Sequence, residues 1–255
     1  MENKKELSIS IVIPTYNEES SIERTLRFAR DFMEVEYSNY EVIVSDDGSK
    51  DETKKIVSAF IKLAGKKFKL LENKHMGKGP AVRFGIMESK MDYVLFMDAD
   101  GATPIKELKR LLIWVTEQGY DIAIASREGL GALRKGEPYF RHLLGRVFNT
   151  IVQFLALPGI QDTQCGYKLF KTDIAKRIFN NLQVYKKQDV IKDSFMGAFD
   201  VEVLLLAKIY GYRVKEVPVT WSFVESKRLN PLRDSFKMLR DVLKIRWNVI
   251  RGKYK

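Results

Sequence analysis

Short runs of β-branched and aromatic residues alternate with longer helical patterns through the first half of this 255-residue chain. Strand-like runs occur at 9–13, 42–44, 68–71, 93–97 and 121–125, and helical patterns occur at 54–63, 80–88 and 105–117. A capping box at Ser20 and Glu23 predicts an earlier helix that continues to Arg30. This alternation predicts an α/β fold whose mostly parallel sheet is covered by helices on both faces.

The pattern changes after residue 127. It continues as a long amphipathic stretch at 139–157, a short irregular segment at 164–170, a polar loop at 183–194, a helix after Asp200 and strands near 214–219. We therefore expect one domain over 1–230, made of halves 1–127 and 128–230, followed by a separate helix over 231–255.

Composition excludes several classes of protein. With 45% apolar residues the chain can bury a full core, so it is not a disordered chain. The single Cys165 rules out an internal disulfide framework, and the first residues lack the order of a secretory signal. The weakly polar run at 147–160 is shorter than the ~20 residues of a spanning helix. These features predict a reducing, cytoplasmic location and no membrane span.

The net charge of +11 is concentrated near the C-terminus. Residues 201–255 hold thirteen Lys or Arg against five Asp or Glu, which is +8 of the total. A basic segment favours an anionic partner, either nucleic acid or a membrane surface. The apolar residues Phe236, Leu239, Leu243, Trp247 and Ile250 recur there at helical spacing, with Lys237, Arg240, Lys244, Arg246 and Arg251 between them.

This terminal pattern is typical of a basic amphipathic helix that lies in a lipid headgroup region. We therefore predict a protein that is peripheral on the cytoplasmic face of a membrane and has no nucleic-acid partner. The alternative, a helix that docks its apolar stripe on its own domain, stays open, and both can hold on different faces of the helix.

Two carboxylates, Asp98 and Asp100, directly follow the strand-like run at 93–97. The carboxyl edge of a parallel sheet is where ligands bind in open α/β folds, and two crowded carboxylates there repel each other unless a cation neutralises them. Mg²⁺ and Mn²⁺ commonly take one or two protein carboxylates and complete their shell with water and phosphate oxygens. The alternative is a turn that caps a helix opening near Thr103 and Pro104.

The ends of two other strand-like runs carry polar residues of similar character. Tyr16 follows the first run and can stack on a nucleobase, and Asp47 follows the second and can accept a hydrogen bond from a base imide. Gly48 allows the backbone to turn close to a ligand. Together with the metal candidate, these residues predict a pocket for a nucleoside diphosphate. Neither G-x-G-x-x-G nor the P-loop pattern is present, and Gly77-Lys78-Gly79 is only a weak phosphate-loop signal.

A family resemblance adds to this interpretation. The segments VIPTYNEE, VSDDGSKD, NKHMGKGPAVRFG, LFMDADGATP, IASR, DTQCGYKLF and AFDVEVLLLA occur in the order typical of inverting glycosyltransferases of the GT-A fold. Within these, the chain most resembles the dolichyl-phosphate β-glucosyltransferases over about residues 7–248. The resemblance implies a GT-A nucleotide-diphospho-sugar transferase fold and transfer of glucose from UDP-glucose to a polyisoprenyl phosphate.

The resemblance also implies roles for residues of the nucleotide-binding half. Uridine would be held by Pro14, Tyr16, Glu18 and Asp47, the ribose side by Asp98, the nucleotide or sugar by Lys78, and the metal by Asp98 and Asp100. The metal would be Mg²⁺ or Mn²⁺ bound to the two phosphates, and Asp100 would be catalytic through it.

In the acceptor half, the resemblance implies that cations meet the acceptor phosphate. These are Arg127, Arg146 and Lys227, while Gln164 and Lys168 would line the sugar pocket and Asp200 would lie near the reacting centre. Arg suits phosphate because its planar fork donates two hydrogen bonds at once. Arg127 and Asp200 are therefore also counted as catalytic candidates.

Three other functions stay open from the sequence. A dolichyl-phosphate mannose synthase would use GDP-mannose, and Ala102, where that branch often has a Gln, argues for glucose by analogy. A nucleic-acid-binding protein would explain the charge of +11 but not carboxylates at a sheet edge. A silent nucleotide-sugar-binding module would bind UDP without transfer.

Overall fold

A seven-stranded sheet forms the centre of the computed structural model, which describes residues 5–185, 197–225 and 231–254. The order across the sheet is β3 (Phe68–Glu72), β2 (Tyr37–Asp46), β1 (Lys5–Thr15), β4 (Tyr93–Met97), β7 (Tyr167–Lys171), β5 (Ile122–Ser126) and β8 (Val214–Pro218). Only β7 runs antiparallel to its neighbours, β4 and β5. The prediction of a mostly parallel α/β sheet is therefore confirmed.

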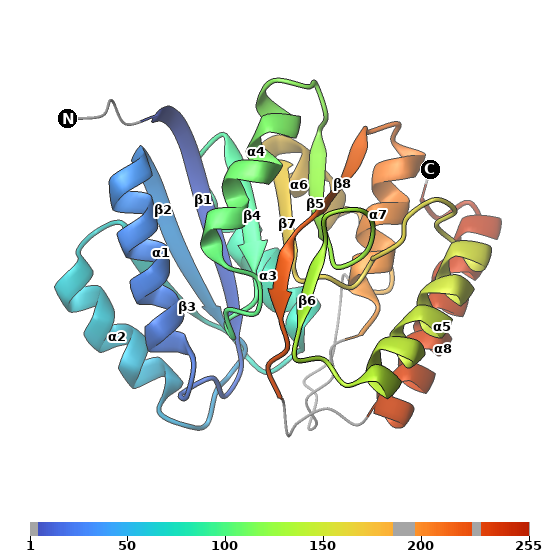
Figure 1. The fold of residues 1–255 in the computed structure, drawn as a ribbon, viewed down its shortest axis with the longest axis horizontal. Helices are drawn as coiled ribbons and strands as arrows, with labels where there is room; N and C mark the ends of the chain where they lie inside the picture. Colours follow the sequence, from blue (N-terminus) through green and yellow to red (C-terminus); the bar gives the residue numbers. More distant parts are fainter. Residues whose placement is uncertain (1–4, 186–196, 226–230, 255) are drawn as a thin grey trace.

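Helices cover both faces of this sheet (Figure 1). The helices α1 (Ile22–Glu36), α2 (Thr53–Ala64) and α4 (Leu108–Thr116) pack on one face, and α3 (Lys78–Glu88), α6 (Thr172–Asn180) and α7 (Phe199–Ile209) pack on the other. A 3₁₀ turn, η1 (Ile105–Glu107), leads into α4. Because side chains alternate across a strand, Ile11 and Ile13 enter one core while Val12 enters the other. Continuous apolar runs thus mark strands buried on both faces.

Two long helices lie side by side at the end of the molecule opposite α1 and α2, at the right in Figure 1. They are α5 (Tyr139–Leu155) and α8 (Pro231–Ile250). The strands β6 (Leu133–Lys135) and β9 (Thr220–Ser222) pair into a small second sheet. In the chain, β6 comes just before α5 and β9 just after β8. None of the helices within the described residues is long and apolar enough to cross a membrane.

The helix α8 is fixed to the domain by both apolar and polar contacts. Val242 and Ile245 are fully buried in the main core. The hydroxyl of Tyr185 donates to the carboxylate of Asp241 over 2.5 Å, and both side chains are buried. The predicted apolar stripe of this helix, however, points away from the domain, since Trp247 is 53% exposed. The helix therefore docks on its own domain and still presents apolar side chains outward. The predicted domain boundary at 230 stays a prediction.

Several local predictions were wrong or incomplete. The first helix begins at Ile22 after Ser21 and runs to Glu36, so Ser20 does not form the predicted capping box with Glu23. The segment 164–170, predicted as irregular, contains most of β7, because its alternating side chains fit between β4 and β5. The elements β6 and α6 were not predicted, and most of the predicted polar loop at 183–194 lies outside the described residues.

Candidate functional site

The carboxyl ends of β1, β2 and β4 meet at one edge of the sheet. Thr15 pairs with Asp46 and Val12 with Phe96, so the loops after these strands lie next to one another. They enclose a cavity of about 680 Å³. Its walls include seven of the predicted residues of the donor site, which are Pro14, Tyr16, Glu18, Asp47, Lys78, Asp98 and Asp100. The tertiary structure thus brings all predicted nucleotide and metal residues of the first half into one pocket, called the donor cavity below.

Asp98 and Asp100 line the donor cavity together with Lys78. The ammonium of Lys78 is 2.5 Å from Asp98 Oδ1. Asp98 lies over Gly166, where a Cβ atom would come within 2.1 Å of Asp98 Oδ2, so only glycine fits beside this carboxylate. Burial lowers the pKa of Lys78, but the negative charges of Asp98, Asp200 and Asp100 outweigh burial and raise it. Lys78 therefore stays charged.

The carboxylates fit a divalent cation. Burial and the charge of Asp98 raise the pKa of Asp100 to about 6, so its ionised form is less favourable than that of a free carboxylate and would be stabilised by a further positive charge. Asp100 Oδ1 accepts a hydrogen bond from the backbone N–H of Ala102 over 2.9 Å, and this bond orients the carboxylate. Within the described residues no group of three or more His, Cys, Asp or Glu side chains forms a metal cage. A cation here would thus depend on substrate phosphate oxygens, as Mg²⁺ and Mn²⁺ commonly do.

Asp47 also lines the donor cavity and is almost fully buried. Its Oδ1 accepts from the backbone N–H of Met76 over 2.8 Å, and its Oδ2 accepts from Gly77 over 2.8 Å. His75 Nδ1 lies 2.7 Å from the same Oδ2. The ring of His75 stacks on the ring of Tyr16, with centroids 3.9 Å apart and planes inclined by 3°. Two of the predicted base-binding residues, Tyr16 and Asp47, are therefore joined by a third that was not predicted.

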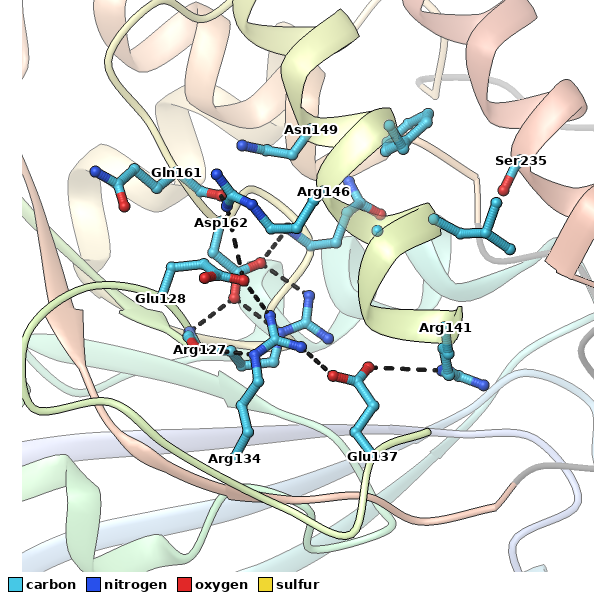
Figure 2. Close-up of a pocket in the computed structure, with 14 residues that line it drawn as sticks. Arg127, Glu128, Arg134, Glu137, Arg141, Arg146, Asn149, Gln161, Asp162 and Ser235 are labelled. Atoms are coloured by element: carbon cyan, nitrogen blue, oxygen red, sulfur yellow. Dashed lines mark hydrogen bonds and ion pairs between the residues drawn. The ribbon is translucent and has the colours of Figure 1, made fainter. Parts of the chain in front are cut away.

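A second, smaller pocket of about 180 Å³ lies between the loop after β5 and helix α5 (Figure 2). We call it the arginine pocket, since its walls include Arg127, Arg134, Arg141 and Arg146, together with the carboxylates Glu128, Glu137 and Asp162. Arg127 and Asp162 form a bidentate pair, with both hydrogen bonds at 2.8 Å. Burial favours the protonated carboxyl, but the charge and hydrogen bonds of Arg127 hold the pKa of Asp162 far below its usual range.

The other arginines of this pocket differ in how closely they are paired with acceptor groups. Arg134 is paired with Glu137 and, over 2.5 Å, with Glu128, as the dashed lines of Figure 2 show. Arg146 donates to the carbonyl of Gln161 over 3.1 Å. Among the described residues, Arg141 has one long ion pair of 3.9 Å with Glu137 and lies over the ring of Phe223, 4.9 Å from its centroid, and burial lowers its pKa. Arg141 is therefore the most weakly neutralised of the four.

The two pockets share part of their walls. Arg127, Arg141 and Gln164 line both the donor cavity and the arginine pocket. A ligand in the donor cavity and an anion in the arginine pocket would thus contact the same three side chains. This connection is the main geometric finding at the site.

Lys168 and Asp200 lie behind these walls. They form an ion pair of 2.5 Å, and Lys168 is 0% exposed and Asp200 3%. Neither is among the residues that line the donor cavity or the arginine pocket. The side chain of Lys168 is directed inward, because Asp200 and the carbonyl of Cys165 accept its hydrogen bonds, and its predicted role at the sugar stays a prediction. The catalytic role of Asp200 stays a prediction.

Lys227, predicted to meet the acceptor phosphate, lies outside the described residues. The sequence reasoning missed His75 and Arg141. A signal for His75 was available, because it is one of two histidines in the chain and follows a strand of the nucleotide-binding half. A signal for Arg141 was its spacing from Gly145 and Asn149, which places all three on one face of α5, and all three line the arginine pocket.

Comparisons with known proteins agree with this geometry. The model of the family "Glycosyl transferase family 2" matches residues 10–179. The dolichyl-phosphate β-glucosyltransferase of Dictyostelium discoideum is 34% identical over all of this chain and 80% of its own length. The human enzyme of the same name is 34% identical over 97% of this chain and 77% of its own, and that of Saccharomyces cerevisiae is 31% identical over 100% and 78%.

Solved structures show the same fold at lower identity. Mannosyl-3-phosphoglycerate synthase from Rubrobacter xylanophilus matches with a TM-score of 0.66 and 18% identity, over 97% of this chain and 76% of its own. Glucosyl-3-phosphoglycerate synthase from Mycobacterium tuberculosis, in complex with Mn²⁺, UDP-glucose and phosphoglyceric acid, matches with a TM-score of 0.64 and 17% identity, over 94% and 80%. These likenesses confirm the predicted GT-A fold.

Proposed function

This chain belongs to glycosyl transferase family 2, and we propose that it transfers glucose from UDP-glucose to a polyisoprenyl phosphate such as dolichyl phosphate, with inversion at the anomeric carbon. The names of the relatives at 31–34% identity support both the sugar and the acceptor. The observation that carries the proposal is the connection between the donor cavity and the arginine pocket, because transfer requires a donor diphosphate and an acceptor phosphate to meet.

The donor is bound by the walls of the donor cavity. Tyr16 offers an aromatic ring to uracil, and Asp47 accepts from its imide N–H. Asp98 and Asp100 would hold Mg²⁺ or Mn²⁺, whose chemistry is to stabilise the negative charge of the diphosphate. Mn²⁺ in the structures of the two fold relatives from Pyrobaculum calidifontis and Mycobacterium tuberculosis supports a divalent cation. Lys78 adds a resident positive charge beside this carboxylate pair.

The acceptor phosphate is bound at the shared wall. Arg141 reaches both pockets and has the weakest internal partner, so its guanidinium is the group best able to take a phosphate. Asp162 accepts two hydrogen bonds from the guanidinium of Arg127 and so fixes the orientation of this side chain in the shared wall. Arg146 lines the arginine pocket but not the donor cavity.

The reaction is a single in-line displacement. An acceptor phosphate oxygen attacks the anomeric carbon opposite the departing UDP, so that an α-linked donor gives a β-linked lipid phosphate sugar. A phosphate monoester has a second pKa near ~6 and is largely ionised at neutral pH, so no strong general base is needed. Asp200 is therefore not needed as a base. Its ion pair with Lys168 suits a role in orienting α7 better than a role in accepting a proton.

The acceptor is a lipid, and a membrane surface is part of the proposal. Exposed apolar side chains gather on α5 and α8, which lie side by side: Phe140, Leu143, Val147 and Phe154 on α5, and Phe236, Leu243, Trp247 and Ile250 on α8. We call this set the apolar face. The basic residues Arg240, Lys244, Arg246 and Arg251 are exposed beside it. Apolar area next to positive charge favours an anionic bilayer surface, in keeping with the predicted peripheral location on the cytoplasmic side.

A donor screen tests the proposed function. Purified protein is given radiolabelled UDP-glucose or GDP-mannose with a polyprenyl phosphate, in Mg²⁺ or Mn²⁺, and the labelled lipid is extracted. Lipid-linked glucose from UDP-glucose is the expected result. Transfer from GDP-mannose alone would instead identify a mannose synthase, and UDP binding without any transfer would identify a silent binding module.

A further inference from the structure

The hydrogen bonds around Asp47 leave one acceptor position open. A carboxylate oxygen accepts about two hydrogen bonds. Oδ2 of Asp47 already receives the backbone N–H of Gly77 and faces Nδ1 of His75, both within 2.8 Å. Oδ1 receives only the N–H of Met76 among the described residues. The remaining acceptor position of this buried carboxylate is therefore on Oδ1, and Asp47 is part of the wall of the donor cavity.

The position of His75 determines which of its nitrogens carries a hydrogen. Nδ1 lies 2.7 Å from Oδ2 and 3.1 Å from the backbone carbonyl oxygen of Asp47. Both oxygens are acceptors when Asp47 is ionised, so Nδ1 is the donor. The ring is held in this orientation by its stack on Tyr16. Nε2 is buried and has no hydrogen-bond partner among the described residues.

We propose that His75 is a positioning residue that sets base specificity: by donating from Nδ1 it keeps Asp47 ionised, so that Oδ1 selects the N3–H of uracil over the hydrogen-free N3 of cytosine. This rests on the proposed function, since it concerns the base of the same donor. An ionised carboxylate can only accept a hydrogen bond, and it therefore rejects an acceptor such as N3 of cytosine. The exocyclic group differs as well, because uracil has a carbonyl where cytosine has an amine.

Electrostatics agrees with this role. Burial is the largest influence and leaves the pKa of Asp47 raised above its usual value, while the N–H of Met76, the donor and charge of His75 and the N–H of Gly77 oppose that rise. Two of these three groups are backbone amides that remain in any side-chain variant. His75 is thus the only one of the three whose contribution a substitution can remove.

The test compares two substitutions that retain different ends of the imidazole. In His75→Asn the side-chain amide nitrogen takes the place of Nδ1, whereas in His75→Gln it takes the place of Nε2. Binding of UDP, CDP and GDP to the full chain is measured by calorimetry with saturating Mn²⁺, and the thermal midpoint of each variant is recorded. The wild type is expected to prefer UDP over CDP by about tenfold or more, as for loss of one charge-assisted hydrogen bond.

His75→Asn is expected to keep the ratio of UDP affinity to CDP affinity within about threefold of the wild-type value. His75→Gln is expected to lose about tenfold in UDP affinity and most of the preference for UDP over CDP. An unchanged ratio in His75→Gln overturns the proposal, and so does an equal loss in both variants, since that would assign the effect to the ring or to Nε2. If His75→Gln does not fold, His75→Ala gives the same comparison. A wild type that prefers GDP would instead overturn the proposed function.

Discussion

Lys168 and Asp200 form an ion pair of 2.5 Å that is removed from solvent on both sides. Lys168 comes from β7, the one antiparallel strand of the sheet, and Asp200 from the first turn of α7. The pair therefore fastens α7 to the sheet directly behind the donor cavity. Since the charge of Asp200 also contributes to the raised pKa of Lys78, the pair acts electrostatically on a residue that lines that cavity.

We expect Lys168→Met to destabilise the fold by about 3 to 5 kcal/mol, because it leaves the carboxylate of Asp200 buried without a partner. The double variant Lys168→Met with Asp200→Asn removes both charges and should recover much of this loss. Urea denaturation of the wild type, both single variants and the double variant measures the effect. A loss below about 1 kcal/mol in the single variant would contradict a buried ion pair.

Asp100→Asn should lower the rate of glucose transfer by about a hundredfold or more while the fold remains intact, because a carboxylate is removed from the proposed metal site. Calorimetric titration of Mn²⁺ into protein with UDP should show a matching loss of metal affinity. Replacement of Glu52, a solvent-exposed residue on the way into α2, by Gln is the matched control. Near-normal turnover in Asp100→Asn, together with activity that survives EDTA, would refute the assignment.

Stability of the metal-free protein should depend on pH through Asp100. Burial and the charge of Asp98 raise its pKa to about 6 in the folded chain from an ordinary value of 3.8, so the folded state binds more protons than the unfolded state between these values. The contribution of Asp100 to the free energy of unfolding is therefore largest at low pH and falls as pH rises from about 4 to about 6. Thermal midpoints in EDTA across this range, compared between wild type and Asp100→Asn, isolate it. A variant with the same slope as the wild type would contradict the shift.

Arg141→Ala should raise the KM for polyprenyl phosphate by about tenfold or more, since one charge-assisted hydrogen bond to phosphate is lost, and should raise the KM for UDP-glucose by a smaller factor. Arg146→Ala, which affects only the arginine pocket, should have a smaller effect. Arg27→Ala on the exposed surface of α1 serves as control. Arg141→Lys should recover only part of the affinity, because a point charge does not replace the planar fork. Equal effects of Arg27 and Arg141 would exclude the assigned role.

The apolar face should mediate binding to anionic liposomes. We expect the wild type to sediment with them at low salt, with each nearby Lys or Arg contributing ~1 kcal/mol that salt weakens. Trp247→Ala with Ile250→Ala should reduce sedimentation but not transfer to a short, water-soluble prenyl phosphate, because both side chains are exposed.

Leu63→Ala is the matched control for that experiment, since Leu63 is an 87% exposed apolar residue on α2, at the other end of the molecule. Loss of thermal stability and of activity on both acceptors in the double variant, with liposome binding unchanged, would show that these residues support the core and not the membrane contact.

Much of the nucleotide-binding half could be predicted from the sequence. Apolar runs such as that before Asp98 marked strands buried on both faces, and the carboxyl ends of parallel strands necessarily share an edge. Tyr16, Asp47 and Asp98 could therefore be placed together from their positions after these runs. The strand β7 was missed because it begins directly after a Cys-Gly pair and pairs antiparallel with strands from distant parts of the chain, which no local pattern indicates.

The sequence by itself determined the alternation of strands and helices in the nucleotide-binding half, the sheet edge that carries the site and the residue types able to bind a diphosphate and a cation, because these follow from local periodicity and from side-chain chemistry. Only the tertiary structure decided which groups are partners. Arg127 could pair with Asp162, Lys168 with Asp200 and His75 with Asp47 only after segments 28 to 35 residues apart had been packed together. Burial then made each of these contacts strong, since a charge removed from water must find its partner within the fold.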